Sequence, residues 1–324
     1  MMRRSIVKGV GAYLPEKVLT NDDLSQLVET SDEWIKQRTG IERRHIAADG
    51  ELTCDLSAKA ALAAMDNAGV TADDIDLVIL ATTTPDNTFP ATAARVQAKL
   101  GVSKGPAFDV QAVCSGFIFA LTQADNMIRL GQAKRALVIG AEIYSRILDW
   151  QDRSTCVLFG DGAGAIVLEA AEGEGSNTDR GVLATSLGTD GRCYDHLYVD
   201  GGVASTQTAG VVKMAGKEVF RQAVSRMCES VEQVLADCDL SKEDLNWLIP
   251  HQANIRIINK VGDKLGLDGS KVIVTVQDHA NTSAATIPLA LTHGVKKGLF
   301  KPGDVIALTA MGGGFTWGAA LLRW

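Results

Sequence analysis

The chain has 324 residues, of which 46% are hydrophobic and 22% charged, and its formal net charge is −7. This length is enough for two domains of ordinary size, and no apolar run reaches the roughly 18 residues needed to span a bilayer. The acidic balance argues against nucleic acid as the main partner, because neutralising phosphate groups needs a basic surface.

The six cysteines form no C-x-x-C pair, and no His/Cys cluster has the spacing of a zinc site. We therefore expect free thiols, no metal and a reducing compartment. The N-terminal residues include Arg3 and Arg4 but lack a long apolar segment, which makes a secretory signal unlikely and favours a cytoplasmic protein.

In the first part of the chain, strands and helices alternate. Capping residues at Asn21 and Ser31 each indicate the start of a short helix. The apolar patterns predict strand 4–10, helix 55–68, strand 77–82, a loop over 83–88, helix 90–100, strand 107–111, helix 114–131, strand 136–142 and strand 163–170. Such alternation predicts parallel β-structure covered by helices.

Residues 171–212 are rich in Gly, Asp, Ser and Thr, which indicates a bridge between two halves together with a surface excursion. Beyond it the pattern predicts helix 214–236, strand 246–250, helix 254–265, strand 272–276, helix 283–298, strand 304–310 and a closing strand over 317–323. We expect two α/β halves, residues 1–172 and 173–324.

Two stretches of the chain match each other. Residues 70–79 and 240–249 each combine a capped acidic turn with a short apolar strand, and Leu100-Gly101 is repeated as Leu265-Gly266. A strand and then a helix follow each Leu-Gly, and the two helices open at Cys114 and near Asn281. A duplicated unit would place a thiol and an amide at equivalent positions, facing one another across a two-fold-like axis.

Cys114 is the best candidate for a nucleophile. It stands between an apolar strand and an apolar helix, and a helix N-terminus lowers the pKa of a thiol by stabilising the thiolate. The alternative is a small buried hydrophobe, which is what most free cysteines are. The other five cysteines fit structural roles, with Cys54 and Cys156 as weaker candidates.

His251 directly follows a predicted strand, and ligands of α/β sheets usually bind at the carboxyl ends of strands. Its alternative is a structural residue beside Asn254, which is typical of an N-cap. Asn281 taken alone also reads as an N-cap, and the internal match to Cys114 is what makes it a functional candidate.

Two glycine-rich segments have different predicted roles. The run Gly312–Gly314 lets backbone amides approach a substrate oxygen closely, although a flexible turn is the alternative. The segment Gly160–Gly164 superficially resembles a nucleotide-binding loop, but it leads into a strand instead of a helix, so we reject a phosphate-binding role.

A Cys at a helix start, a His after a strand and an Asn at a helix start coincide here, and the chain resembles the thiolase-like condensing enzymes over essentially its whole length. It is most similar to the bacterial β-ketoacyl-[acyl-carrier-protein] synthase III family. The motifs that carry the resemblance are residues 30–35 with 38–41, Ala107–Val110 before Cys114, Phe159–Gly164, Pro250–Asn254, Asn281–Ala285 and Gly312–Gly318. Ala280 departs from the Gly that is usual before the Asn.

The resemblance implies a duplicated five-layer α-β-α-β-α fold and an acyltransferase. The implied reaction condenses an acyl-CoA starter, acetyl-CoA in the first instance, with malonyl-[acyl-carrier-protein]. It gives a 3-oxoacyl-[acyl-carrier-protein], CoA and CO₂ and initiates fatty acid synthesis. Cys114, His251 and Asn281 would be the catalytic set, and the backbone amides of Cys114 and Gly313 the oxyanion hole. No metal or cofactor is implied, because the CoA thioester is itself the substrate.

The resemblance also implies binding residues. Trp34 and Arg153 would sandwich the adenine of CoA, with Arg38 near phosphate and Asn254 also in contact. Leu158 and Met214 would line the acyl pocket. Phe89 would reach across a homodimer interface into the acyl pocket of the partner.

Carrier protein is acidic and so is this chain, so a local basic patch must overcome their mutual repulsion. Two stripes at i, i+4, i+8 spacing qualify on two predicted helices, although most such stripes are simply solvated: Arg256, Lys260 and Lys264 on one, and Lys213, Lys217 and Arg221 on the other. Arg256 follows His251 by five residues, so we expect the first stripe near the mouth of the site.

Two other functions remain open. One is a related condensing enzyme of secondary metabolism with a different starter or acceptor, and the sequence does not fix the starter. The other is a non-catalytic acyl-binding protein on the same fold. The intact Cys-His-Asn set argues against the second, since a scaffold has no need of it.

Overall fold

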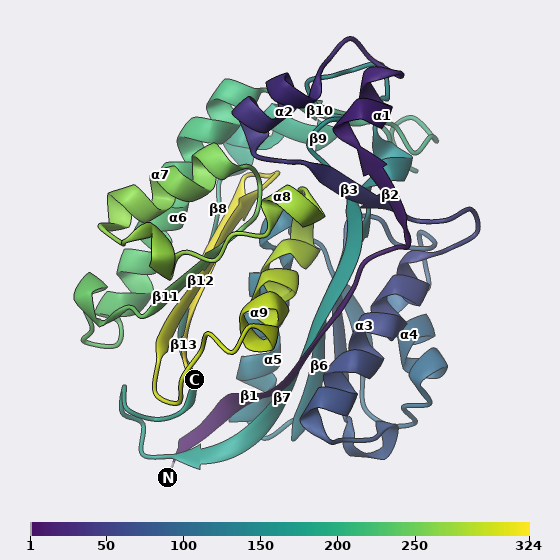
Figure 1. The fold of residues 1–324 in the computed structure, drawn as a ribbon. Helices are drawn as coiled ribbons and strands as arrows, with labels where there is room; N and C mark the ends of the chain where they lie inside the picture. Colours follow the sequence, from purple (N-terminus) through teal and green to yellow (C-terminus); the bar gives the residue numbers. More distant parts are fainter. Residues whose placement is uncertain (1) are drawn as a thin grey trace.

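The computed structural model describes residues 2–324, and two stacked sheets form its frame (Figure 1). The first sheet has the order β1-β7-β6-β4-β5 and the second β11-β12-β13-β8. The bounds in the first sheet are β1 Met2–Tyr13, β4 Leu77–Ala81, β5 Ala107–Val110, β6 Arg135–Ile143 and β7 Asp161–Gly173. Those in the second are β8 Gly181–Thr189, β11 Trp247–Pro250, β12 Val305–Gly312 and β13 Thr316–Arg323.

The two sheets repeat one topology. Strand β4 pairs with β6 in parallel and β6 with β7 antiparallel, just as β11 pairs with β12 in parallel and β12 with β13 antiparallel. The matching acidic stretches become the short 3₁₀ turns η1 (Ala72–Asp74) and η5 (Lys242–Asp244), each with a capping box. The predicted duplication is confirmed.

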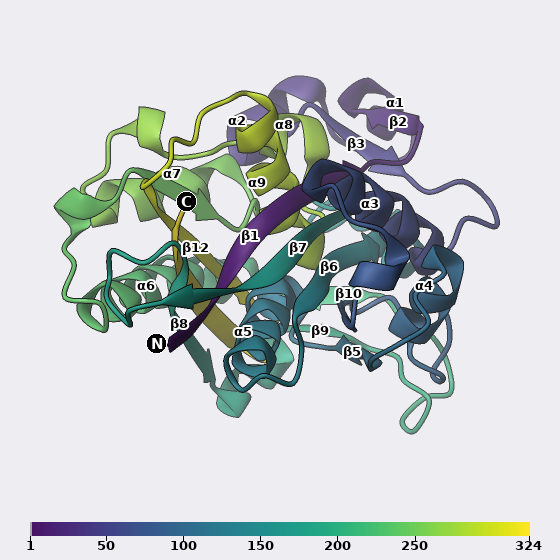
Figure 2. The ribbon, with the colours of Figure 1, turned by 90° about the horizontal axis from the view of Figure 1, so that it is seen from below.

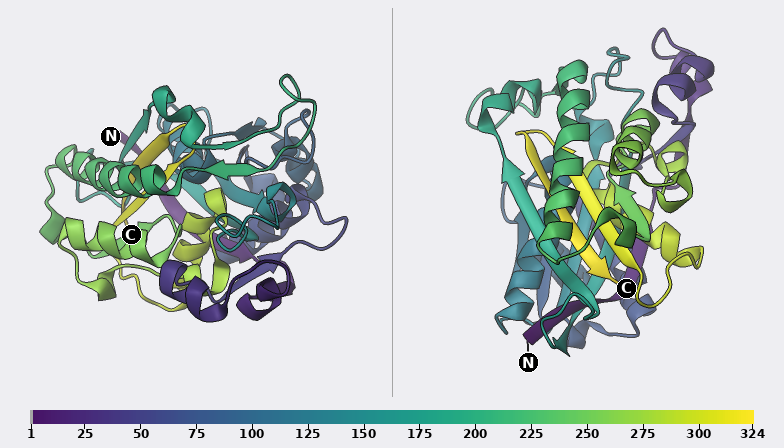
Figure 3. Two further views of the ribbon diagram at one scale, coloured as in Figure 1. Left: turned by 90° about the horizontal axis from the view of Figure 1, so that it is seen from above. Right: turned by 90° about the vertical axis from the view of Figure 1, so that its left-hand side faces the viewer.

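Helices fill three layers around the sheets. The outer layers are α3 (Thr53–Ala68) with α4 (Thr92–Leu100) on the first sheet, and α6 (Gly216–Ala236) with α7 (Ile255–Leu265) on the second. Between the sheets lie α5 (Gly116–Arg129) and α9 (Thr286–Lys296), with mostly buried apolar side chains. Figures 1 and 3 show the five layers, which confirm the expected α-β-α-β-α fold.

The repeated Leu-Gly pairs mark equivalent helix ends. Helices α4 and α7 both stop at a glycine, Gly101 and Gly266, and each glycine has φ 73. This left-handed conformation is strained for residues with a Cβ, which is why glycine recurs at both places.

The remaining elements gather at the end of the sheets that is uppermost in Figure 1. They are β2 (Lys17–Thr20), α1 (Asn21–Ser25), α2 (Asp32–Thr39), β3 (Arg43–Ile46), β9 (Leu197–Val199), β10 (Val212–Met214) and α8 (Val276–His279). Ser31 caps α2 by accepting from Trp34 N at 3.1 Å. The other 3₁₀ turns are η2 Val113–Ser115, η3 Tyr144–Ile147, η4 Gly191–His196, η6 Gly269–Lys271 and η7 Ser283–Ala285.

The predicted strand 272–276 is wrong. Only Val272 bridges to Leu248 of β11, and α8 begins at Val276. The buried amide of Gln252 takes the hydrogen bonds that a neighbouring strand would make, because Nε2 donates to Ile273 O at 3.1 Å and Oε1 accepts from Thr275 N at 2.8 Å. The counterpart of β5 is thus reduced to a single bridge.

The connecting segment predicted over 171–212 contains more regular secondary structure than expected, because it includes β8, the edge strand of the second sheet. Helix starts also differ from the prediction. Helix α6 begins at Gly216 because residues 212–214 pair with β9, and 3₁₀ turns precede α5 and α9. The segment Gly160–Gly164 leads directly into β7, which begins at Asp161, and this agrees with the rejection of a phosphate-binding loop.

The equivalence proposed for Cys114 and Asn281 is wrong by three residues. The turns η2 and η7 both begin with a non-glycine residue at positive φ, Val113 at 50 and Ser283 at 49. Aligning these first residues makes Ala284 the counterpart of Cys114. Asn281 lies just before its turn instead of in it.

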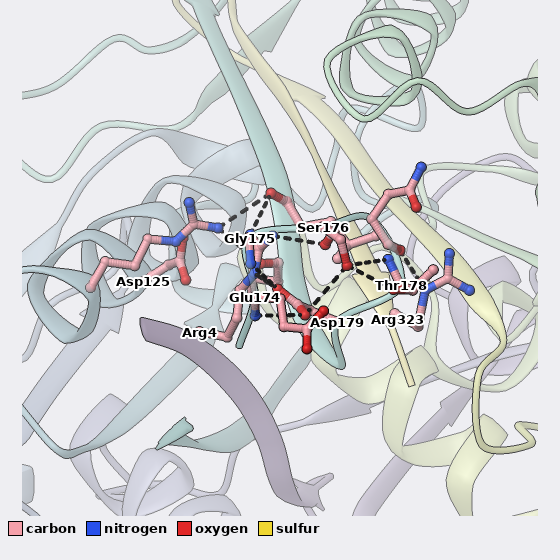
Figure 4. Close-up of polar contacts among 12 residues, drawn as sticks. Arg4, Asp125, Glu174, Gly175, Ser176, Thr178, Asp179 and Arg323 are labelled. Atoms are coloured by element: carbon pink, nitrogen blue, oxygen red, sulfur yellow. Dashed lines mark hydrogen bonds and ion pairs between the residues drawn. The ribbon is translucent and has the colours of Figure 1, made fainter. Parts of the chain in front are cut away.

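The connection between the sheets is held by arginines from both ends of the chain (Figure 4). Arg4 donates through Nε to Asp179 Oδ2 at 3.0 Å and through Nη2 to Ser176 O at 2.9 Å, and Arg323 Nε donates to Asn177 O at 2.7 Å. A backbone hydrogen bond from Glu174, aided by Arg4, lowers the pKa of Asp179 to about 2. Figure 2 shows this end of the molecule, where β1 and β8 meet.

Candidate active site

A cavity of about 590 Å³ is lined by residues from both halves of the chain. Cys114 enters it from η2, His251 from the end of β11 and Asn281 from the segment before η7. The fold therefore brings the three candidates to one cavity, although 137 residues separate the first from the second.

Cys114 is buried, with 4% of its surface exposed. Burial raises the pKa of its thiol to about 12, and the nearby Ser283 hydroxyl opposes this only in part. The direction is opposite to the lowering expected from a helix start, because burial of the thiolate is the largest cause of the shift. The thiol needs a base before it can act as a nucleophile.

The glycine run after β12 packs directly against Cys114. A Cβ at Gly312 would lie 2.5 Å from Cys114 N, and one at Gly313 would lie 2.6 Å from Leu197 O. Only residues without a side chain let the two backbones come this close. The loop thus lies beside the nucleophile, although Gly313 is not among the residues that line the cavity.

His251 is fixed at both its backbone and its ring. Its N–H donates to Thr309 O at 2.7 Å, and its Nδ1 lies 2.7 Å from Thr286 Oγ1. Burial lowers the pKa of the imidazole to about 3, so the ring is neutral at physiological pH. With Nδ1 held by the Thr286 hydroxyl, Nε2 is the ring nitrogen left for a ligand.

Asn281 is oriented by the backbone around it. Its Oδ1 accepts from Ser283 N at 2.9 Å, while its own backbone N–H donates to Leu158 O at 2.9 Å. Because the carbonyl side of the amide is occupied, the Nδ2 protons remain to donate elsewhere. The N-cap alternative holds only in part, since the bond closes a local turn and no α-helix starts there.

The mouth of the cavity is cationic. It is lined by Arg38, Arg153, Lys217 and Arg256, and its lining contains no Asp or Glu among the residues that the structure describes. This is notable in a chain of net charge −7 and favours an anionic ligand. Asn254 also lines it, and its Oδ1 caps α7 by accepting from Ile257 N at 3.0 Å.

Trp34 already carries two guanidinium groups. Arg38 Cζ lies 4.7 Å and Arg153 Cζ 5.2 Å from the centroid of its ring. A flat base between Trp34 and Arg153 would need a gap of roughly 7–8 Å, which is twice a contact distance. The two side chains must therefore separate before they can sandwich an adenine.

The expected acyl-pocket residues fall into two groups. Leu158 and Met214 line the cavity, whereas Phe89 lies outside it with 82% of its surface exposed. Phe89 is therefore not part of the cavity formed by its own chain.

The sequence did not single out several residues of the site. Tyr144 and Phe159 stack at 4.6 Å between ring centroids and line the cavity, as do Leu197, Phe220 and Met227. Glu142, Ser283 and Thr286 lie buried around Cys114 and His251. A signal for Glu142 existed, because a lone acid within an apolar strand is unusual.

The two basic stripes differ in how far their charges are neutralised. Lys213 pairs with Asp200 at 3.5 Å and Arg221 with Glu218 at 2.7 Å on the α6 side. Arg256, Lys260 and Lys264 are exposed on α7, and within residues 2–324 they form no salt bridge. The α7 stripe keeps its charge available, and Arg256 also lines the cavity.

Within the described part of the chain, no group of three or more His, Cys, Asp or Glu side chains is placed to hold a metal ion. None of the helices described is both long enough and apolar enough to cross a membrane.

Comparisons with known proteins agree along the whole chain. The family model for 3-oxoacyl-[acyl-carrier-protein] synthase III matches residues 108–191, and the model for the C-terminal part of that family matches residues 235–324. The β-ketoacyl-[acyl-carrier-protein] synthase III of Rhodospirillum centenum is 62% identical over 324 residues, which is 100% of each chain.

Solved structures are similar as well. The 3-oxoacyl-[acyl-carrier-protein] synthase III from Aquifex aeolicus matches with a TM-score of 0.93 and 47% identity, over 99% of this chain and 100% of that one. The corresponding protein from Pseudomonas aeruginosa has a TM-score of 0.93 and 44% identity, over 99% and 98%.

Proposed function

The chain belongs to the 3-oxoacyl-[acyl-carrier-protein] synthase III family, and from this premise we propose how its cavity carries out the reaction. It is a condensing acyltransferase of fatty acid synthesis that joins an acyl-CoA to malonyl-[acyl-carrier-protein]. The roles of individual residues are argued below from the geometry of the site.

The first half-reaction loads Cys114. Its sulfur attacks the thioester carbonyl, and exchange of one thioester for another is nearly isoenergetic, so a thiol suits an acyl carrier. We assign the oxyanion to the backbone amides of Cys114 and Gly313, and the close packing of the glycine loop on Cys114 supports this. Such donors are typically worth about 3–4 kcal/mol each. CoA then leaves.

The second half-reaction decarboxylates the malonyl group. Loss of CO₂ leaves negative charge on the thioester oxygen, and hydrogen-bond donors that are neutral or cationic stabilise this charge. Asn281 supplies one donor through its Nδ2 protons. Neutral His251 supplies the other in the tautomer that carries its proton on Nε2, in which the Thr286 hydroxyl donates to Nδ1 instead of to Ser283 O. The resulting carbanion attacks the acyl carbonyl on Cys114 and gives the 3-oxoacyl product. The meeting of these three groups on one cavity is the observation that carries the proposal.

The cationic mouth fits the phosphates of CoA. Arg38, Arg153, Lys217 and Arg256 would bind them, and the adenine would stack on Trp34 once Arg153 moves away. Asn254 retains its Nδ2 protons for the same ligand, because only its Oδ1 caps α7.

We further propose a homodimer, acetyl-CoA as starter, a reaction without metal or cofactor, and a cytoplasmic location. The dimer is supported by Phe89, whose exposure of 82% is unusual for a large aromatic side chain. It would complete the partner's acyl pocket beside Leu158 and Met214.

The loading step gives a direct test. Incubation with radiolabelled acetyl-CoA should place label on Cys114, found by peptide mass spectrometry, and malonyl-carrier protein should then release it as a 3-oxoacyl thioester. Absence of label on Cys114 would contradict the assignment. A panel of acyl-CoA starters, read as product chain length, separates acetyl from longer starters.

Carrier docking on α7 needs variants that spare the CoA site. Since Arg256 lines the cavity, the charge reversals are Lys260→Glu with Lys264→Glu, which lie farther along the helix. The KM for malonyl-carrier protein should rise about tenfold while acyl transfer from CoA is unchanged. Lys213→Glu with Arg221→Glu, whose partners already neutralise them, is the control. Equal loss in both double variants would contradict docking on α7.

A further inference from the structure

A buried carboxylic acid lies in the strand beneath the nucleophile. Glu142 is in β6, which is otherwise apolar in this region, and its exposure is 0%. Glu142 is close enough to Cys114 to affect the pKa of the thiol. None of the steps described above uses this side chain.

The two oxygens of Glu142 have different surroundings. Oε2 accepts from Thr83 N at 3.0 Å, from Thr83 Oγ1 at 2.8 Å and from Thr84 Oγ1 at 2.9 Å. Oε1 has no hydrogen-bond partner within residues 2–324. An unpaired buried carboxylate oxygen is costly, so its retention calls for a role.

Ser283 belongs to η7, which packs both on η2, where Cys114 lies, and on β6, where Glu142 lies. Its hydroxyl makes no hydrogen bond of ordinary geometry to the described residues, yet it is close enough to lower the pKa of both Cys114 and Glu142. Its backbone is in the left-handed region, with φ 49, a conformation that serine rarely adopts. Such strain in a buried turn is typical of a functional position.

Of the two bases near Cys114, Glu142 is the stronger. Burial raises the pKa of Glu142 to about 7 and lowers that of His251 to about 3. The Nδ1 of His251 is in addition held by Thr286. A group with a pKa near neutrality is the better acceptor for a proton from a buried thiol.

We propose that Ser283 and Glu142 form a proton relay that activates Cys114, with Glu142 as the acceptor and Ser283 as the carrier. The inference rests on the proposed role of Cys114 as acyl acceptor. As sulfur attacks the thioester carbonyl, its proton passes to Ser283 Oγ while the hydroxyl proton passes to Glu142 Oε1. The S–C bond forms, the C–S bond to CoA breaks, and the CoA thiolate takes its proton from water.

The same relay closes the cycle. In the condensation step the carbanion forms a C–C bond to the acyl carbonyl, and the Cys114 thiolate leaves. Glu142 returns its proton through Ser283 to the sulfur, which restores the thiol and the carboxylate. No proton is gained or lost by the enzyme over both half-reactions, and the only further reactant is the water that protonates the CoA thiolate.

Among residues 2–324, the titratable groups that interact electrostatically with Glu142 include the Cys114 thiol and the Tyr144 phenol, and burial raises the pKa of the phenol well above its usual value. Both stay protonated near neutral pH, so an inflection of the acylation rate in that range belongs to Glu142.

The test measures two reactions of Cys114 between pH 5 and 10. One is single-turnover transfer from labelled acetyl-CoA, and the other is alkylation by iodoacetamide, which reports thiolate formation without any acyl substrate. The variants are Glu142→Gln and Ser283→Ala. Thr83→Val is the matched control, because it removes one hydrogen bond to Glu142 but keeps the carboxyl.

In the unmodified chain both rates should rise through a pKa near 7. Glu142→Gln should lower both about 10²-fold at pH 7 and remove that inflection, and Ser283→Ala should do the same, whereas Thr83→Val should keep the inflection. Rates of Glu142→Gln or Ser283→Ala within threefold of the unmodified chain, or a loss equal to that of Thr83→Val, would overturn the relay. Failure of acyl transfer in the unmodified chain would instead refute the proposed function, and the alkylation profiles would still decide the relay.

Discussion

The turns η2 and η7 have similar backbone conformations but carry different functional side chains. Each begins with a non-glycine residue near φ 50 and leads into a buried apolar helix, α5 or α9. The first carries Cys114, and the equivalent position in the second is Ala284. A Cβ at Gly116 would lie 3.6 Å from the Cβ of Ala284, so the two turns face each other across the centre of the molecule.

This difference shows how a duplicated fold yields an asymmetric site. The backbone is repeated, whereas the side chains are specialised: the N-terminal turn presents the sulfur, and the C-terminal one supplies donors and the hydroxyl groups around it. A change at Cys114 should therefore abolish acylation, whereas a change at Asn281 should affect condensation alone.

The largest effect is expected at the turn that carries the sulfur. Cys114→Ala should reduce acyl transfer from acetyl-CoA by at least ~10³-fold, because the covalent intermediate has no other acceptor. Rapid-quench measurement of labelled protein checks this. The control is Cys228→Ala, which changes a buried cysteine on α6 and should retain acylation. Labelling of the Cys114→Ala chain at the unmodified rate would refute the assignment.

The opposite pattern is expected before η7. Asn281→Asp keeps the shape and the acceptor at Oδ1 but removes the Nδ2 donor, so condensation should fall about 10²–10³-fold. Acylation of Cys114 should stay within a few-fold. Stopped-flow and product assays on pre-acylated enzyme separate the two, and a parallel loss of acylation would show that Asn281 also acts in the loading of Cys114.

A smaller effect is expected from Thr286, the residue that positions His251. Thr286→Val removes the hydroxyl 2.7 Å from Nδ1 and should lower the kcat of condensation about tenfold, or about 1.4 kcal/mol, by loosening the ring. Thr286→Ser retains the hydroxyl and should retain the rate. Identical kcat values in Thr286→Val and the unmodified chain would contradict a positioning role for Thr286.

The smallest effect concerns stability. The pKa of His251 is about 3 in the folded chain against an ordinary 6.5, so the unfolded state binds more protons between these values. Stability should therefore fall as pH falls from 6.5 toward 3, and His251 alone should account for about 2 kcal/mol at pH 5.

Urea titrations at pH 7 and pH 5 measure this loss of unfolding free energy. His251→Phe should show a smaller loss than the unmodified chain, and the remaining loss includes His279, which is also buried with its pKa lowered to about 4. Equal losses in both chains would contradict a neutral buried His251.

The sequence by itself determined the order of the elements, the duplication and the three main candidates. These depend on local patterns: apolar periodicity, capping boxes, and glycines at helix ends such as Gly101 and Gly266. Cys114, His251 and Asn281 stood out because each was predicted to lie where a strand gives way to a turn or helix. All three line one cavity, although the helix α8 and not a strand precedes Asn281.

Only the tertiary structure decided the rest, because it depends on contacts between segments far apart in the chain. Gln252 replaces a strand by bonding across to residues 273–275, and Ser283 meets Glu142 only because η7 packs on β6. The high pKa of Cys114 likewise follows from burial, which a helix start alone could not reveal. Local patterns select the reactive residues, and the packing of the two halves sets their protonation and their partners.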